Sequence, residues 1–295
     1  MSHDHQEIDL SLIAGVTDRG LRHRQNEDAM ELAVVPAADG PVLVAVVCDG
    51  VSTSIRPAEA SLAAAQAAAQ VLRTAAQDGT DLTEASSAAV RSAEGAVASL
   101  AKSPGGVGSA TFVSAVVTRS AATLCWLGDS RAYWLGAPVT PAPEAPAPEA
   151  PAPEAPASGA PAPGAPGAEP AAPETARRLT RDDSLAEEMV AAGLLPEDEA
   201  LNSPHAHVVT RWVGADPGEA TPHVVTFEPP GPGVLMLCSD GLWNYQPDAG
   251  KLAELALPGA LTNPLAAAQT LVAFAIEAGG RDNITVILAP FPPGT

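Results

Sequence analysis

The sequence predicts an α+β fold in which two antiparallel β-sheets pack as a sandwich and helical pairs cover both outer faces. Short apolar runs rich in Val and Leu alternate with turn residues, which indicates strands. Two consecutive alanine-rich segments interrupt these runs, as expected for a hairpin of helices on one sheet. The second half of the chain then repeats strands, a helix and a strand. Together these observations favour four layers in the order helix, sheet, sheet, helix.

Apolar runs and helix signals divide the first half of the chain into elements. The alanine-rich segment 57–77 predicts a helix, because Pro57 stands in its first turn and Gly79 follows it. A second helix is expected at 82–100, which completes the hairpin. Strands are expected at 10–18, 41–49, 110–118, 122–129 and 131–135.

The second half of the chain shows the same kinds of signal. The amphipathic pattern of 263–280 predicts a helix that Asn263 caps, and 283–291 predicts the closing strand. A short helix is expected at 184–195, and strands are expected at 207–213, 223–228 and 234–240.

A proline-alanine repeat with scattered glutamates occupies 137–175. Repeated proline removes backbone N–H donors and alanine offers little surface to bury, so we expect a disordered, solvated, partly polyproline II segment. The sequences on its two sides each look incomplete as a fold. We therefore interpret 1–295 as one domain, with its core at about 10–290 and this segment as an insertion.

Composition and charge limit the classes of partner. Acidic residues outnumber basic ones by 35 to 15, and a net charge of −20 repels nucleic acid and anionic membranes, so neither is expected as a partner. The three cysteines stand in apolar runs without the close spacing of a zinc or redox site. The N-terminus lacks a signal-peptide pattern, and no apolar run reaches the roughly 18–20 residues that cross a bilayer. A cytoplasmic protein is expected.

Carboxylates collect at the ends of predicted strands. Each one alone is explained as a turn residue. As a group, converging carboxylates would repel one another strongly unless they protonated or bound cations. Because hard oxygen ligands select Mg²⁺ or Mn²⁺ over Zn²⁺, the pattern predicts a site for such ions, with one carboxylate shared between two of them. The carboxylates are Asp49, Asp129 and Asp240 after strands, Asp282 before the last strand, and Glu27 and Asp28 near another strand.

Seven stretches of the chain resemble motifs of a known family in their order and approximate spacing. They are TDRGLRHRQNEDA, VVCDG, GSAT, WLGDSRAYWL, LTRDDS, LMLCSDGLW and GGRDNITVI. The family is that of the metal-dependent serine/threonine protein phosphatases, called PPM or type 2C, and the NED and GDSRAY wording is similar to its bacterial members. The resemblance covers nearly the whole chain and implies a pair of antiparallel sheets flanked by helical pairs.

The resemblance also implies a centre of two Mn²⁺ or Mg²⁺ ions. Asp49 would bridge both ions, and the carbonyl of Gly50 would bind one of them. Asp240 and Asp282 would hold the first ion.

Further carboxylates have implied roles at the rim of this centre. Glu27 or Asp28 would reach the second ion, mostly through ordered water. Asp129 would join Asp240 at a weaker third ion.

The activity that the resemblance implies is hydrolysis of protein phosphoserine and phosphothreonine by direct attack of a water that bridges the two ions. No phosphoenzyme is expected, because no Ser-His-Asp order is evident. The expected substrates are phosphoproteins of a bacterial-type serine/threonine kinase, and the expected state is a monomer.

The chain departs from the family at the residue that usually grips the substrate phosphate. Relatives have an arginine five residues before the aspartate of NED, and this chain has His23 there. On an extended strand, Arg22 and Arg24 would face away from the side of His23. The candidate phosphate contacts are therefore His23 itself, or Arg22 if a local bulge turns it inward, whereas a polar strand residue is the alternative for His23.

A second departure follows Asp49 and Gly50. Relatives continue with two glycines and a histidine, whereas this chain continues with VSTSIRPAEAS, whose small hydroxyl residues tolerate tight turns less freely than glycine. Arg56 is either a substitute phosphate contact or a surface residue at a helix start. These changes motivate an alternative function, a phosphatase-fold module that binds or regulates phosphoproteins with weak or no turnover.

A third departure lies in LTRDDS. Asp183 replaces a frequent histidine, and Asp182 would serve either the third ion or the adjoining flap, a mobile segment that tunes substrate choice in the family. The flap is expected at 184–203, where acidic PEDEA suits either a basic substrate or a solvated face. His205 and His207 are expected to be structural residues far from the aspartates.

Overall fold

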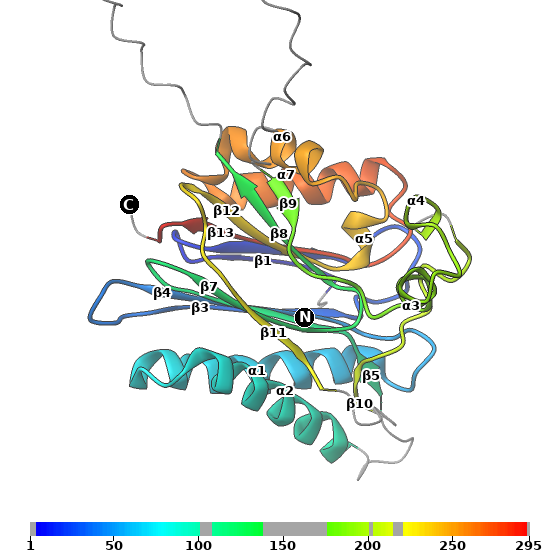
Figure 1. The fold of residues 1–295 in the computed structure, drawn as a ribbon, viewed down its shortest axis with the longest axis horizontal. Helices are drawn as coiled ribbons and strands as arrows, with labels where there is room; N and C mark the ends of the chain where they lie inside the picture. The colour runs from blue at the N-terminus through cyan, green and yellow to red at the C-terminus, as the bar shows by residue number, and fades with distance from the viewer. Residues whose placement is uncertain (1–3, 101–107, 138–175, 201–202, 215–220, 294–295) are drawn as a thin grey trace, which may run out of the picture.

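The structure is a computed structural model that describes residues 4–100, 108–137, 176–200, 203–214 and 221–293. The expected insertion, apart from residue 137, lies outside the described residues. Two antiparallel sheets face each other and helices cover both outer sides (Figure 1). The predicted four-layer α+β sandwich is confirmed.

Six antiparallel strands form the upper sheet of Figure 1, in the order β1-β2-β13-β12-β8-β9. The first and last thirds of the chain thus share one sheet, which explains why neither side of the insertion looks complete in sequence. The bounds are β1 His5–Asp9, β2 Ala14–Asp18, β8 Arg131–Gly136, β9 Ala176–Arg178, β12 Gly233–Cys238 and β13 Ile284–Phe291.

Five antiparallel strands form the lower sheet, in the order β11-β7-β6-β4-β3. A two-stranded pair, β10 with β5, lies beside it. The bounds are β3 Asp28–Val35, β4 Val42–Asp49, β5 Ser109–Ala110, β6 Phe112–Val117, β7 Ala122–Leu127, β10 Val213–Gly214 and β11 His223–Phe227.

Strand β4 shows how the layers are held together. Its side chains alternate between two apolar clusters, because successive residues of a strand point to opposite faces. Val44 and Val46 pack with the helices, and Leu43 and Val47 pack between the sheets. An unbroken apolar run is therefore what a strand buried on both faces requires.

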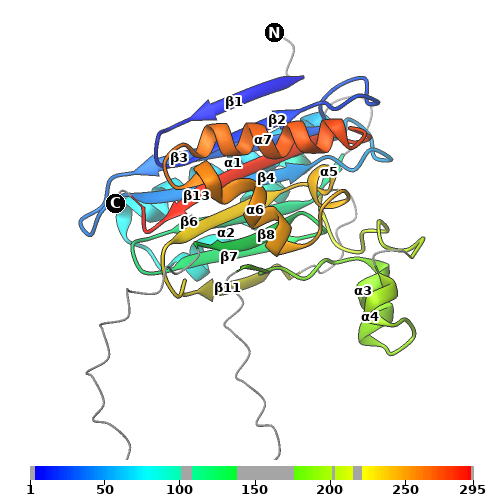
Figure 2. The same ribbon diagram turned by 90° about the horizontal axis from the view of Figure 1, so that it is seen from above.

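Two helical pairs cover the sheets (Figures 1 and 2). Helices α1 (Pro57–Asp78) and α2 (Leu82–Ser99) form the expected hairpin on the lower sheet, and α1 ends at Gly79 with φ 68°. Helices α6 (Ala249–Ala260) and α7 (Pro264–Glu277) cover the upper sheet. Short helices complete the chain: α3 Leu185–Ala191, α4 Glu197–Ala200 and α5 Asp240–Trp243. None of the described helices is both long and apolar enough to span a membrane.

Some of the expected elements differ from the structure. The strand expected at 207–213 is wrong: the segment forms turns, and only β10 at its end is a strand. Helix α6 was not expected, because Gly250, Pro258 and Gly259 obscure its periodicity. Residues 19–26 form a loop, and not the extended strand that would turn Arg22 and Arg24 away from the side of His23.

Candidate metal centre

Four aspartates lie at one end of the sandwich because strands of both sheets begin or end there. In the lower sheet, antiparallel pairing sets Asp28 at the start of β3 directly opposite Asp49 at the end of β4. In the upper sheet, Asp240 follows β12 and Asp282 precedes β13, and these two strands are also antiparallel neighbours. Both sheets therefore deliver carboxylates to the same end of the molecule.

Backbone contacts fix Asp49 and Gly50. The Asp49 N–H donates to Thr111 Oγ1 at 3.1 Å, and the Thr111 N–H donates to the Asp49 carbonyl at 2.8 Å. Gly50 donates its N–H to the Glu27 carbonyl at 3.1 Å. A Cβ at position 50 would stand 2.7 Å from the carbonyl oxygens of Glu27 and Pro57, so only glycine fits this close approach.

Glycine has the same role beside the two aspartates of the upper sheet. A Cβ on Gly241 would lie 2.0 Å from the Asn283 carbonyl oxygen. The turn before Asp282 contains Gly279 at φ 140° and Gly280 at φ 50°. The Asp-Gly and Gly-Gly pairs of the sequence therefore allow these turns to pack closely at the centre.

Asp28 is buried, and one of its oxygens is held by two hydroxyls. Ser239 Oγ and Thr285 Oγ1 each donate to Asp28 Oδ2 at 2.7 Å, whereas the buried Asp28 Oδ1 has no hydrogen-bond partner among the described residues. Behind Thr285, a buried chain continues through Thr17 to Asn26. Burial, the largest cause, raises the pKa of Asp28 to about 6, against the effect of the two hydroxyls.

Three further aspartates have raised pKa values. Burial is the first cause for each, and the neighbouring carboxylates are the second. The pKa of Asp49 lies well above its ordinary value, with Asp28, Asp240, Asp129 and Asp282 all contributing. The pKa of Asp240 is raised by burial and then by Asp129 and Asp282. Burial and then Asp182 raise the pKa of Asp129 to about 7. The predicted carboxylates are thus close enough to repel one another.

Divalent cations fit these residues. The oxygens are hard ligands of the kind that Mg²⁺ and Mn²⁺ prefer. Asp28 Oδ1 and Asp240 Oδ1 are both buried and have no hydrogen-bond partner in the part of the chain that the structure describes. Within the described residues, no three His, Cys, Asp or Glu side chains are already closed around one point. Mutual repulsion keeps carboxylates apart, and the charge of a cation would offset it.

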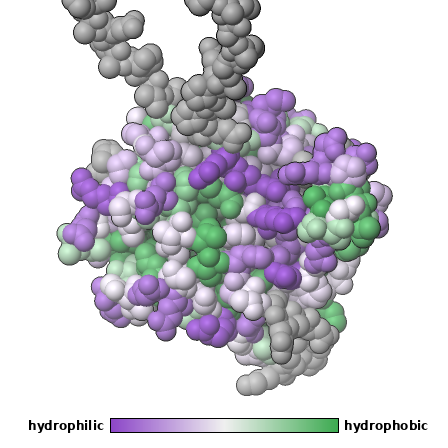
Figure 3. Space-filling view, viewed as in Figure 1, coloured by the Kyte–Doolittle hydropathy of each residue, from purple (hydrophilic) through white to green (hydrophobic). Residues whose placement is uncertain are grey.

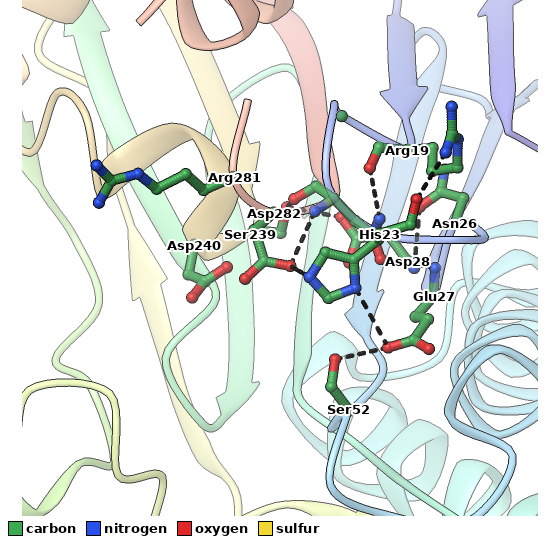
Figure 4. Close-up of polar contacts among 12 residues, drawn as sticks. Arg19, His23, Asn26, Glu27, Asp28, Ser52, Ser239, Asp240, Arg281 and Asp282 are labelled. Carbon is green, nitrogen blue, oxygen red and sulfur yellow. Dashed lines mark hydrogen bonds and ion pairs between the residues drawn. The ribbon is translucent and has the colours of Figure 1, made fainter. Parts of the chain in front are cut away.

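Glu27, His23 and Ser52 form the rim of the centre (Figure 4). Ser52 Oγ donates to Glu27 Oε2 at 2.6 Å, so a residue of the unusual VSTS loop orients a predicted metal ligand. His23 lies between two carboxylates, with Nε2 3.1 Å from Asp282 Oδ1 and Nδ1 3.9 Å from Glu27 Oε2. A side chain in this position lies directly beside the predicted metal ligands.

The arginines near His23 differ in their contacts. Arg19 donates to the His23 carbonyl at 2.6 Å and braces the loop. Arg22 and Arg24 are exposed, and neither side chain has a hydrogen bond or ion pair among the described residues. Arg56 pairs with Glu59 at the start of α1, which agrees with a surface residue at a helix start.

The segment that begins the predicted flap is anchored to the upper sheet. The buried Arg131 binds both oxygens of Asp182, with Nη2 2.6 Å from Oδ2, and its guanidinium lies 3.6 Å from the Trp243 ring centre. Trp243 in turn donates Nε1–H to the Asp129 carbonyl at 2.9 Å. Asp182 therefore anchors the flap, and its oxygens are engaged by arginine.

Asp183 fixes the other side of the same segment. Its Oδ2 accepts the N–H of Gly128 at 3.1 Å, and its Oδ1 lies 2.9 Å from His223 Nε2 and 3.3 Å from Arg211 Nη1. Gly128 has φ 101° and immediately precedes Asp129. The aspartate in place of the frequent histidine is thus used to hold the turn next to a predicted metal ligand.

A cleft of about 560 Å³ opens beside Asp282. Its other walls come from α5 and the turn after it, from α4, and from His207, whose ring stacks on Trp243 with centroids 5.8 Å apart. His207 is therefore not far from the aspartates, contrary to expectation, because residues 203–212 turn back over α5 instead of forming a strand.

Figure 3 shows an apolar patch at the right-hand edge, where Figure 1 has α3 and α4.

Several residues at the centre were not expected from the sequence. Asn283 links two loops, because its Oδ1 accepts the Glu27 N–H and its Nδ2 donates to the Arg19 carbonyl. Ser239 and Thr285 hold Asp28. In the sequence, only their position next to a predicted ligand could have indicated Ser239, which precedes Asp240, and Asn283, which follows Asp282.

Comparison with known proteins agrees with the motifs and the fold, although no family model matches the chain. It is 28% identical over 179 residues to the serine/threonine phosphatase Stp of Listeria innocua, which is 60% of this chain and 55% of that protein. The chain thus spans about half the length of the curated relatives it matches.

Solved structures match over nearly the full length. The PPM Ser-Thr phosphatase MsPP of Mycobacterium smegmatis, in complex with cacodylate, is 25% identical with a TM-score of 0.66, covering 95% of this chain and 97% of that one. The catalytic domain of the phosphatase PstP in complex with two manganese ions is 22% identical with a TM-score of 0.64, covering 94% and 96%. On its motifs, its fold and these similarities, the chain resembles the bacterial members of the PPM family of serine/threonine phosphatases.

Proposed function

We propose that this protein is a metal-dependent phosphoprotein phosphatase that hydrolyses phosphoserine and phosphothreonine. The observation that supports this most strongly is the gathering of Asp28, Asp49, Asp240 and Asp282 from both sheets at one end of the sandwich. A module that only bound phosphoproteins would have no need for such a carboxylate cluster, and the relatives are named as phosphatases. The alternative of a weak or inactive binding module is therefore not favoured.

The proposed ligands follow the sequence prediction. Asp49 would be shared by the two ions and the Gly50 carbonyl would bind one of them. Asp240 and Asp282 would bind the first ion, and Glu27 or Asp28 would reach the second, mostly through ordered water. When bound, two Mn²⁺ or Mg²⁺ ions would supply a water nucleophile near neutral pH and neutralise charge on the phosphoryl group.

A third ion is a further proposal, with Asp129 and Asp240 as its ligands. In support of this site, Asp129 is the neighbouring carboxylate that contributes most to the raised pKa of Asp240.

The chain's own side chains would orient these ligands and the substrate. Ser239 and Thr285 hold Asp28 by hydrogen bonds to its Oδ2, so that its Oδ1 stays available to a ligand. Ser52 holds Glu27 by a hydrogen bond to Oε2. His23, beside Asp282, is the candidate to contact the phosphate or to donate a proton to the leaving oxygen. Arg22 stays a second candidate, since its exposed side chain is on the same loop.

We further propose phosphoproteins of a bacterial-type serine/threonine kinase as substrates, a monomeric state and action in the cytoplasm. Free, buried Cys48, Cys125 and Cys238 support a reducing compartment.

The test of this function is Mn²⁺-dependent hydrolysis of an aryl phosphate by the purified chain. Asp49→Asn removes the charge of the bridging ligand, so we expect at least a roughly 100-fold loss of kcat. Asp39→Asn, the same change in the exposed turn between β3 and β4, is the matched control and should retain the parent rate. Absent or metal-independent hydrolysis by the parent protein would refute the proposal.

A further inference from the structure

The cleft beside the candidate metal centre contains a cation that the proposed chemistry does not use. Arg281 lines it together with Asp282, Trp243 and Tyr245. In Figure 4 the Arg281 side chain extends away from the carboxylates that surround His23, and no dashed contact reaches it. Adjacent residues of one turn thus point to different places: Asp282 to the centre and Arg281 to the cleft.

The turn that holds Arg281 is braced. Its backbone N–H donates to the Tyr245 hydroxyl at 2.9 Å, and the Leu21 N–H donates to the Gly280 carbonyl at 2.7 Å. Gly280 at φ 50° fits tightly against Leu21. The backbone at this exposed arginine is therefore held in place by contacts with both Tyr245 and Leu21.

Like Arg22 and Arg24, Arg281 is an arginine without a carboxylate partner among the described residues. In a chain of net charge −20, many arginines bind carboxylates, as Arg131 binds Asp182 and Arg211 binds Asp183. The Arg281 guanidinium has no hydrogen bond or ion pair with the rest of the described chain, although Asp282 is its neighbour in sequence. It is free to receive an anion from outside.

We propose that Arg281 determines substrate specificity by binding the carboxylate of an acidic residue that flanks the phosphorylated residue of the substrate. This inference rests on the proposed phosphatase function. A phosphate held at the carboxylate cluster would leave the adjoining peptide to enter the cleft, whose volume of about 560 Å³ accommodates side chains of a peptide. A guanidinium binds a carboxylate through two parallel N–H donors.

The experiment compares three synthetic phosphothreonine peptides that differ only in flanking residues: acidic, neutral or basic. The readout is kcat/KM for each, measured with Mn²⁺ at low ionic strength. We expect the parent to prefer the acidic over the neutral peptide by about fivefold, the size of a partly exposed ion pair. That ratio should fall to about one in Arg281→Gln, and Arg281→Glu should favour the basic peptide. Raising the salt concentration should also weaken the parent's preference.

The matched control is Arg91→Gln, an exposed arginine of α2 on the opposite helical layer, which should keep the parent's peptide ratio. An unchanged ratio in both Arg281 variants would overturn the inference. Aryl phosphate hydrolysis by the parent separates the two claims: if the parent is active on it but shows no Arg281-dependent ratio, only the specificity inference fails. If no substrate is hydrolysed, the proposed function itself fails.

Discussion

At the scale of single residues, the orientation of Asp28 depends on hydroxyl groups that sit behind it. Each hydroxyl has one proton to donate. Because Thr285 donates to Asp28, the proton between Thr285 and Thr17 must come from Thr17, which in turn accepts from Asn26. The donors thus run in one direction toward Asp28 Oδ2 and leave Oδ1 as the oxygen available to a ligand.

Replacing Thr285 tests this arrangement. Thr285→Val keeps the shape of the side chain but removes the donor, so we expect Mn²⁺ affinity to fall by about 10–100-fold, as is typical for the loss of a partner behind a ligand. Isothermal titration calorimetry measures the affinity without relying on turnover. Thr285→Ser retains the hydroxyl and should bind Mn²⁺ nearly as the parent does.

A second control is Thr270→Val on the exposed side of α7, where the hydroxyl bonds only to the helix backbone. Urea unfolding in a chelator checks that each variant is folded. Parent-like Mn²⁺ affinity in a folded Thr285→Val protein would contradict the role assigned to Thr285.

At the scale of elements, a buried ion pair holds the start of the flap to strand β8. Arg131 and Asp182 are both buried, with side-chain exposures of 1% and 4%. Arg178 reaches the same carboxylate at 3.6 Å and also binds Glu187 in α3. The flap helix is therefore connected to the sheet through charged groups, of which Arg131 and Asp182 are buried and Arg178 and Glu187 are partly exposed.

Asp182→Ala would leave the Arg131 guanidinium buried without its carboxylate. We expect the free energy of unfolding to fall by about 3–5 kcal/mol, because an unpaired buried charge costs far more than an intact pair contributes. Urea unfolding measures the change. Asp39→Ala in an exposed turn should change stability by less than about 0.5 kcal/mol.

The double variant Arg131→Met, Asp182→Leu distinguishes an unpaired charge from simple loss of packing. It should recover part of the lost stability, since apolar side chains do not need a charged partner. A cost below about 1 kcal/mol for Asp182→Ala would show that this pair does not anchor the flap.

At the scale of the whole molecule, the fold could be predicted from the sequence because its elements follow simple periodicities. Strand β4 is a continuous apolar run, and α1 has both a proline at its start and a glycine at its end. Helix α6 and the turns of 203–212 could not be predicted, because their conformation depends on packing against other elements. His207 illustrates this: only its stacking on Trp243 brings it to the cleft.

The candidate site was predictable in part for a similar reason. The aspartates at strand ends can be recognised in the sequence, since Asp49 and Asp240 each interrupt an apolar run before a glycine. The residues that orient these aspartates cannot be recognised in this way. Thr285 is an alternating residue of β13, and only the register with β2, which pairs it with Thr17, sets its hydroxyl under Asp28. Such contacts come from tertiary pairing and have no local sequence signal.

The insertion at 137–175 can also be tested at this scale, because the residues on its two sides are described. Strands β8 and β9 are antiparallel neighbours, with Leu135 opposite Ala176, so the chain leaves and re-enters the sheet at adjacent positions. Deleting 142–173 would leave 137–141 and 174–175 to join them, which is slightly longer than the usual hairpin loop of about 2–5 residues and long enough to close the turn. The insertion is thus not needed to span any distance in the fold.

We therefore expect the protein without 142–173 to fold with the stability of the parent to within about 1 kcal/mol and to retain its basal Mn²⁺-dependent turnover of an aryl phosphate. Shortening a loop changes only its closure entropy, which varies slowly with length. Circular dichroism with urea unfolding and a steady-state assay measure the two quantities. A matched deletion that also removes Ala176 and Arg177 should destabilise the protein, because it removes β9 from the edge of the sheet. Insoluble or inactive protein from the shorter deletion alone would mean that the repeat contributes to the folded domain.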